Sequence, residues 1–333
     1  MEIGESTYGS DRSGLVCAYA FTPGQRGRSI DADEAARRVE AGLAMSAEFL
    51  WLHFSLANAA SERWLIGHLA LPDAFYEALQ ATSATRVEVV DEALLAVIND
   101  VHFFAWEPSS ASRVTLYVDR RVVVSARTTP LRAIDRLRVA VNSGEAFRSP
   151  AELLAHLLRD QAEVLVEIVR DATGQVDGIE DRIIENQATS RPKLGALRRI
   201  LVRLQRLLAP EPAALFRLLN RPPDWLSEGD VTDLRQSAEE LAAAVADSAA
   251  LVERVRLLQE ELMALLNERT NRTLFILTTV TVLALPMTII PGLFGMNVGG
   301  VPFAASPAGF WAVLVLVILI VGAGAALTHS RRR

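Results

Sequence analysis

The sequence predicts an α+β cytosolic domain with a mixed sheet and helices, followed by a long stalk helix and two transmembrane helices. Three observations support this fold class. Strand-like and helical runs alternate up to about residue 130. A heptad-like pattern without proline or glycine then covers residues 230–272. Two uncharged apolar runs, residues 274–294 and 308–327, lie near the end of the chain.

The first 225 residues are expected to form one cytosolic domain. Its strands are predicted from short runs rich in apolar and β-branched residues, at 14–21, 48–56, 93–98, 113–119 and 121–126. The last two strands are close enough to form a hairpin turning near residues 119 and 120. Helices are predicted over 31–43, 61–69 and 72–81. A long antiparallel helical pair is expected within 150–220, from residues 150–186 and 192–219.

The stalk is predicted over residues 226–273. Apolar residues recur there at heptad-like spacing: Leu234, Leu241, Val245, Val252, Val255, Leu262 and Leu266. Because no break signal separates the stalk from the first apolar run, one helix from about 231 to 294 would be about 95 Å long. Such a helix cannot bury its apolar stripe alone. We therefore infer that it associates with copies of itself or with neighbouring helices.

The stalk is also acidic, with ten Asp and Glu against three Arg in residues 224–261. One interpretation is a helix face that simply lies in water. The other is a negatively charged vestibule, built from several such helices, that concentrates cations. The sequence favours neither.

The two apolar runs are each long enough to cross a hydrocarbon layer about 30 Å thick. Arg269 and Arg272 precede the first run, a basic tail at 328–333 follows the second, and the loop at 295–307 has no charge. The positive-inside rule then places both termini in the cytosol. The N-terminus has no apolar segment typical of a signal peptide, which agrees with a cytosolic domain.

The first run carries a polar stripe. At 100° per residue, its members fall within an arc of about 100°: Asn271, Leu274, Thr278, Thr281, Leu285 and Thr288. Ile276, Val280, Leu283 and Met287 face the other way. Thr in a membrane helix often bonds to its own backbone or joins helices, so the stripe alone leaves open whether it lines a pore. The small residues 322–326 of the second run indicate close packing against a neighbouring helix.

Composition and motifs exclude several classes of protein. A net charge of −6 does not indicate a nucleic-acid partner. The single cysteine, Cys17, allows no disulfide within the chain, and the five histidines lack metal-ligand spacing. There is no phosphate-binding loop and no nucleophile elbow. We therefore expect no enzyme, no catalytic residue, no cofactor and no bound-metal site that can be assigned to particular residues.

The motif Gly295, Met296, Asn297 lies between the two apolar runs. Together with the stalk and the basic tail, it resembles the CorA superfamily of divalent-cation transporters over essentially the whole chain. The segment at 295–302, GMNVGGVP, is similar to the ZntB zinc-transport branch. The chain departs from the magnesium branch because no acidic residue follows the motif. Other segments similar to ZntB are WLHF at 51–54 and YVDRRVVVSAR at 117–127.

The resemblance implies a homopentameric funnel in a bacterial inner membrane, with the first spans around a central pore. Gly295, Met296 and Asn297 would then form the ion-selectivity loop, with five Asn297 amides at the outer mouth. The pore would be lined by the polar stripe: Asn271, Leu274, Thr278, Thr281, Leu285 and Thr288. The implied cargo is Zn²⁺, with other divalent cations possible and the direction of transport and any proton coupling left open.

No His, Cys, Asp or Glu lies between residues 273 and 327, so the expected pore lacks the ligands that strip water from Zn²⁺. We therefore expect the ion to pass hydrated, with Leu274 and Leu285 as dry constrictions. Two alternatives remain open. One is a Mg²⁺, Co²⁺ or Ni²⁺ transporter of the same fold, and the other is a membrane-anchored metal sensor or scaffold that transports nothing.

Overall fold

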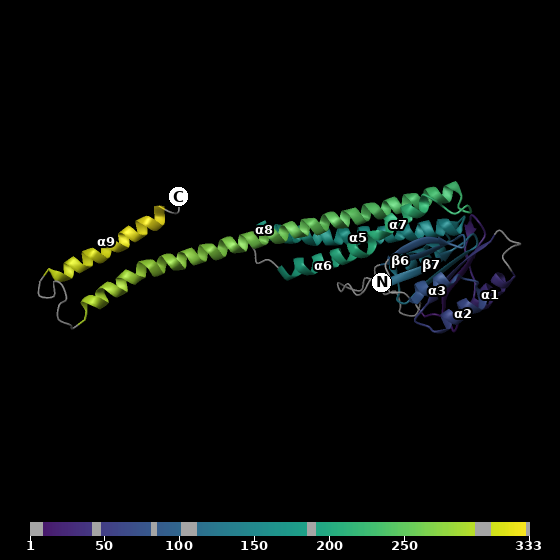
Figure 1. Cartoon of the computed structure of the whole chain (residues 1–333), viewed down its shortest axis with the longest axis horizontal. Coiled ribbons are helices and arrows are strands. Elements are labelled where there is room, and N and C mark those ends of the chain that lie inside the picture. The colour runs from purple at the N-terminus through teal and green to yellow at the C-terminus, as the bar shows by residue number, and fades with distance from the viewer. Residues whose placement is uncertain are drawn as a thin grey trace. The chain divides into compact units, whose positions relative to one another are not determined.

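The computed structural model describes residues 9–41, 48–80, 85–100, 112–184, 191–296 and 308–330 (Figure 1). The chain divides into two compact units, Met1–Leu257 and Leu258–Arg333. The final residues of the predicted helices at 31–43, 72–81 and 150–186 lie outside the described residues, as does the end of the basic tail.

A seven-stranded mixed sheet organises the first unit. Its strand order is β3-β1-β4-β8-β7-β6-β5, and only β4 and β8 pair in parallel. The strands are β1 (Leu15–Phe21), β3 (Arg28–Ser29), β4 (Phe49–Ser55), β5 (Arg86–Val90), β6 (Ala93–Asp100), β7 (Ser112–Val118) and β8 (Val122–Arg127). A separate two-stranded sheet pairs β2 (Gln25–Arg26) with β9 (Ala146–Phe147). The predicted β7–β8 hairpin is confirmed, with the Asp119 amide donating to the Val122 carbonyl at 3.0 Å.

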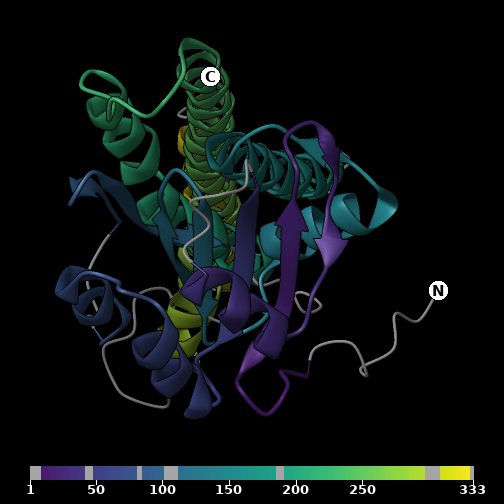
Figure 2. The same ribbon diagram turned by 90° about the vertical axis from the view of Figure 1, so that its right-hand side faces the viewer.

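Helices cover both faces of the sheet (Figure 2). Strand alternation sends Leu94, Ala96 and Ile98 of β6 to one face and Leu95 and Val97 to the other. The second face packs against α1 (Ala32–Glu40), α2 (Ala60–His68) and α3 (Asp73–Gln80). The first packs against α4 (Arg132–Ser143) and parts of α5 (Pro150–Ile184), α7 (Pro210–Leu219) and α8 (Glu228–Phe294).

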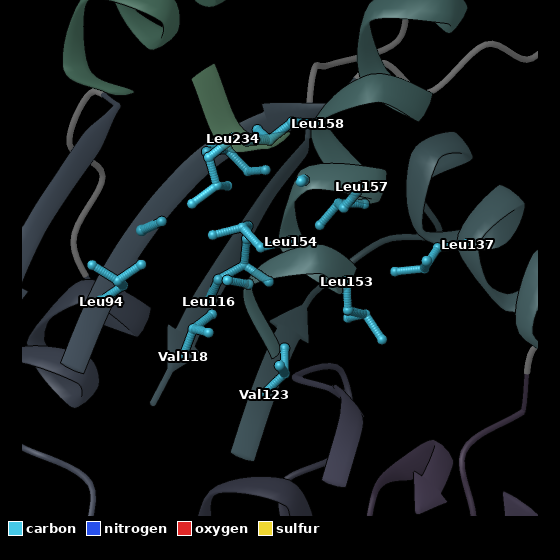
Figure 3. Packing of buried hydrophobic residues seen from close by; sticks show 14 of the residues in the cluster. Leu94, Leu116, Val118, Val123, Leu137, Leu153, Leu154, Leu157, Leu158 and Leu234 are labelled. Carbon is cyan, nitrogen blue, oxygen red and sulfur yellow. The ribbon is translucent and has the colours of Figure 1, made fainter. Parts of the chain in front are cut away.

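A hydrophobic cluster lies on each face of the sheet, and the larger one, on the first face, anchors helices α4, α5, α7 and α8 to the sheet. Figure 3 shows Leu154, Leu157 and Leu158 of α5 beside strand residues such as Leu116. Leu234, from the start of α8, joins the same cluster and is 1% exposed. The stalk therefore begins as part of the core of the first unit.

The predicted helical pair needs one correction. Its second helix is not continuous over 192–219 but divides into α6 (Arg191–Leu208) and α7. Pro210 and Pro212 explain the division, because proline has no amide hydrogen and favours the first turn of a new helix. Strand β5 and helix α4 were missing from the sequence prediction. Strand β5 has only five residues, two of them charged, and among the described strands it lies at the sheet edge beside β6, so its local pattern is weak.

Helix α8 runs without interruption for 67 residues. It confirms the predicted long helix that continues from the stalk into the first apolar run. In the part of the chain that the structure describes, α8 is the helix whose length and composition would let it cross a membrane. A second helix, α9 (Gly309–Ser330), contains a shorter apolar stretch, Gly309–Gly324.

Candidate functional site

One face of the apolar half of α8 is partly covered. The half-buried positions are Thr279, Leu283, Pro286, Ile290 and Phe294. At 100° per residue they fall on one side of the helix. A Cβ atom added to Gly324 of α9 would lie 3.3 Å from Cδ2 of Leu283. Helix α9 therefore packs closely on this face, as the small residues at 322–326 predict.

The polar stripe lies on the opposite face of α8. All six of its residues are exposed in the single chain: Asn271, Leu274, Thr278, Thr281, Leu285 and Thr288. Leu274 is 54% exposed and Leu285 55%. The stripe spans seventeen residue steps, about 26 Å along the helix axis. The structure thus places these side chains together, on the side of α8 that points away from the α9 contact.

Two stripe hydroxyls bond to the backbone of their own helix. Thr281 Oγ1 donates to the Leu277 carbonyl at 2.9 Å, and Thr288 Oγ1 donates to the Leu285 carbonyl at 3.0 Å. A hydroxyl that has given its only hydrogen to the backbone still has oxygen lone pairs facing outward. These Thr oxygens can therefore accept hydrogen bonds from water.

The helix ends where the predicted loop begins. The Gly295 amide donates to the Pro291 carbonyl at 2.8 Å, and the Met296 amide to the Leu293 carbonyl at 3.4 Å. A Cβ atom at position 295 would lie 3.1 Å from the Pro291 carbonyl oxygen, so glycine suits this tight end. Met296 is 52% exposed. Asn297 and the rest of the loop lie outside the described residues.

Among the described residues, no group of three or more His, Cys, Asp or Glu side chains could hold a metal ion. His53 is fully buried in the sheet, with Nδ1 2.7 Å from Ser125 Oγ and Nε2 accepting from Arg127 Nε at 2.8 Å. Burial and the nearby Arg127 charge hold its pKa well below the usual range. His53 is therefore a neutral structural residue, which agrees with the absence of metal-ligand spacing among the histidines.

Sequence reasoning missed one buried polar cluster in the first unit. Glu211 at the start of α7 is fully buried. It accepts from the Asn99 amide and from Gln161 Nε2, each at 2.6 Å. Burial raises the pKa of its carboxyl to about 8, although these hydrogen bonds act in the other direction. In the sequence, Glu211 is marked only by its place between Pro210 and Pro212, a pattern typical of the start of a helix. This pattern does not indicate that Glu211 is buried.

A family model described as CorA-like Mg²⁺ transporter protein matches residues 46–328. The chain belongs to this CorA-like family. A divalent-cation transporter of the CorA-like family needs no catalytic centre, and its members are transporters rather than enzymes. The predicted family is therefore confirmed, and so is the prediction that the chain is not an enzyme.

Three comparisons place the chain within the CorA-like family. It is 26% identical to the zinc transport protein ZntB of Pectobacterium atrosepticum, over 82% of this chain and 84% of that protein. It is 29% identical to the divalent cation transporter CmaX of Pseudomonas aeruginosa, over 92% and 93%. The solved structure of full-length CmaX superposes with a TM-score of 0.81 at 26% identity, covering both chains completely. The predicted fold class is confirmed.

Proposed function

We propose that this chain transports Zn²⁺ across the bacterial inner membrane, as a homopentamer whose α8 helices surround a central pore. The observation that carries the proposal is the division of α8 into two faces. One face is taken by α9 through Gly324 and Leu283. The other bears the exposed polar stripe, Asn271 to Thr288. In a ring of copies, this face would line a shared, water-filled pore.

The chemistry of the stripe suits an ion that keeps its water. Water bound to a divalent cation presents hydrogens outward, so the pore wall must offer acceptors. The Thr281 and Thr288 oxygens do so, because their own hydrogens are held by the helix backbone. The amide of Asn271 adds a further acceptor at the cytosolic end, and in this proposal Asn297 does so at the outer mouth with Gly295 and Met296.

Zn²⁺ is supported by the ZntB relatives and by the absence of an acidic residue after the Gly295-Met296-Asn297 motif. With no His, Cys, Asp or Glu between residues 273 and 327, selection by direct zinc ligands is not available. Hydrated Zn²⁺ and Mg²⁺ are similar in size and charge. We therefore expect Zn²⁺ to be preferred over Mg²⁺ by a modest factor.

The test is metal uptake by the purified full-length chain in proteoliposomes, with Zn²⁺ and Mg²⁺ in parallel and with or without a pH gradient. We expect Zn²⁺ flux that Asn297→Ala reduces by about tenfold or more. Asn220→Ala serves as a matched amide control, because Asn220 is exposed at the end of α7 and lies outside both predicted spans. Membrane insertion of each variant is checked by quantifying the reconstituted protein.

The second candidate cargo is Mg²⁺, with Co²⁺ and Ni²⁺. The family model favours it by its description as a Mg²⁺ transporter. Mg²⁺ also dehydrates reluctantly, which agrees with a pore of hydroxyl and amide oxygens. Mg²⁺ flux equal to or faster than Zn²⁺ flux would assign the chain to this alternative. A chain that carries neither ion would contradict both.

A further inference from the structure

Helix α6 presents an unusual basic surface. Its 18 residues include six Lys or Arg and no acid. Four of its residues follow the spacing i, i+3, i+4, i+7 and therefore share one face: Arg199, Val202, Arg203 and Arg206, all exposed. Val202 is 41% exposed in the middle of this face. We call these four residues the α6 face.

A groove of about 440 Å³ lies between α5 and α8 of the first unit. Its charged lining consists of four acids and one base: Glu163, Glu167, Arg170, Glu240 and Asp247. Val166 lies among them and is 39% exposed. Arg136 reaches Glu163 at 3.2 Å and Glu167 at 2.6 Å, and Arg159 lies 3.6 Å from Glu240, so three of the four acids already have a basic partner within the chain. We call this the α5–α8 groove.

The two surfaces lie on opposite sides of one three-helix packing. Val164, Leu165 and Ile168 of α5 share a buried cluster with Leu204 and Leu208 of α6 and with Ala244 of α8. Viewed along their axes, three helices around a common core form a triangle with one helix at each corner. The outward face of α6 lies at one corner, and the α5–α8 groove lies on the side of the triangle opposite to it.

We propose that the α6 face of one copy docks into the α5–α8 groove of the next copy, with Val202 against Val166. Each surface has an apolar centre with charges around it, and the charges are predominantly of opposite sign. This is the arrangement expected of an interface with an apolar core and a polar rim. The occupant is a second copy of this chain, since the complementary surface is present on the same molecule.

The geometry also determines the kind of assembly. A contact between two different surfaces on opposite sides of a protomer is heterologous, and it generates a ring when the rotation closes. The inference rests on the ring of copies proposed above and names the cytosolic surfaces that hold it together. It can fail on its own, because a ring could instead be held by other surfaces.

Disulfide trapping tests the contact in native membranes. The full-length chain carries Cys17→Ala, so that the only thiols are those introduced. Val202→Cys and Val166→Cys are combined in one chain, and the sample is oxidised. Both positions are exposed, so the fold should tolerate them. We expect a reducible ladder on a denaturing gel that extends beyond a dimer, because each copy can link to two neighbours.

The controls separate this contact from others. A chain that carries either Val202→Cys or Val166→Cys alone should remain monomeric on the gel. When these two single-cysteine chains are co-expressed, they should cross-link to each other as dimers. Val139→Cys on α4, which is 67% exposed, replaces Val166→Cys as the mismatched partner and should give no ladder. Val202→Cys should also react with a water-soluble maleimide at least tenfold more slowly than Val139→Cys in the intact assembly.

Any one of three results would overturn the inference: no ladder from an assembly that remains intact, a dimer from Val202→Cys alone, or equal maleimide rates at the two positions. Metal flux of the same samples, measured in proteoliposomes, distinguishes this failure from failure of the proposed function. Normal Zn²⁺ flux without a ladder rejects only the interface. A ladder without any flux rejects only the transport proposal.

Discussion

Glu211 shows how a single residue can link stability to pH. Its carboxyl lies where β6, α5 and α7 meet, and Gln161 Nε2 also donates to the Asn99 carbonyl at 2.5 Å. The negative charge of Asp100 also raises the pKa of Glu211, by less than burial does. Asp100 itself accepts from the Ala133 amide at 2.8 Å. The cluster therefore joins four elements, β6, α4, α5 and α7, through groups that are almost fully buried.

The folded state should lose stability as the pH rises through this group's titration. Between the ordinary Glu pKa of 4.5 and the raised value of about 8, the folded chain holds a proton that the unfolded chain releases. Stability should therefore fall over that range and level off above it. Glu211→Gln cannot titrate, so it should escape this loss. The free energy of unfolding of the variant minus that of the parent should therefore be larger at pH 8 than at pH 5, by up to a few kcal/mol.

Thermal unfolding of the detergent-solubilised full-length chain at several pH values measures this difference. Glu239→Gln, an exposed site on α8, is the control and should leave the pH profile unchanged. Parallel profiles for the parent and Glu211→Gln would show that Glu211 stays ionised in the folded chain. Any lost hydrogen bond in the variant appears as an offset that does not depend on pH.

Leu274 gives a second residue-scale prediction. If it is a dry constriction, Leu274→Asn should raise basal divalent-cation flux by several-fold, because a polar ring lets water persist in the pore. Ile276→Asn places the same side chain on the other face of α8 and should leave flux per folded protein unchanged. Stopped-flow uptake into dye-loaded vesicles measures both. Unchanged flux in Leu274→Asn would contradict a gate at this level.

The pairing of α8 and α9 is the feature that matters at the scale of elements. Gly324 lies against Leu283, whereas a Cβ atom added to Gly322 would meet no described atom of another element within 4 Å. Gly324→Val should therefore destabilise the helix pair by about 1–3 kcal/mol through overpacking. Gly322→Val, two positions away in the same helix, should cost much less.

Thermal stability of the reconstituted chain measures the difference, followed by fluorescence-detected size-exclusion chromatography. A lower midpoint and loss of the assembled peak are expected for Gly324→Val alone. Equal behaviour of the two variants would mean that α9 does not use this contact in the membrane. It would also weaken the argument that the stripe face of α8 is the one left for the pore.

Elements with strong local signals were the ones predicted from sequence. The β7–β8 hairpin and the long α8 have regular periodicity and clear turn or break signals, so pattern alone finds them. The division between α6 and α7 was missed although Pro210 and Pro212 mark it. The Glu211 cluster could not be predicted, because its partners Asn99 and Gln161 lie far away in sequence and meet only through tertiary packing. The face of α8 that contacts α9 could likewise be identified only from the structure.

At the scale of the whole molecule, charge is distributed unevenly. Residues 224–261 carry ten acids against three bases, a larger acid excess than that of the whole chain, whereas α6 carries six bases and no acid. A molecule whose net charge is only −6 therefore contains two strong opposing fields. In an assembly of several copies, the acidic stretches of α8 would add together, and this favours accumulation of cations at the cytosolic side.

The dependence of divalent-cation flux on ionic strength tests whether this electrostatic field attracts cations. Raising the ionic strength from about 0.01 M to 0.1 M shortens the screening length from about 30 Å to 10 Å. Divalent-cation flux from the cytosolic side, at subsaturating ion, should then fall several-fold. The double variant Glu239→Gln with Glu261→Gln, at two exposed sites, should show a weaker dependence. A salt response identical in parent and variant would indicate that these carboxylates only lie in water.

Two prolines lie within α8 near its C-terminal end, Pro286 and Pro291. Neither has an amide hydrogen, so the helical bonds that would reach back to the carbonyls of Val282 and Met287 do not form. The terminal turns thus resist bending less than the turns around Leu274. In the proposed pore, the end of α8 that carries these prolines would therefore be more compliant than the section around Leu274, and it would widen or tilt more readily than that section.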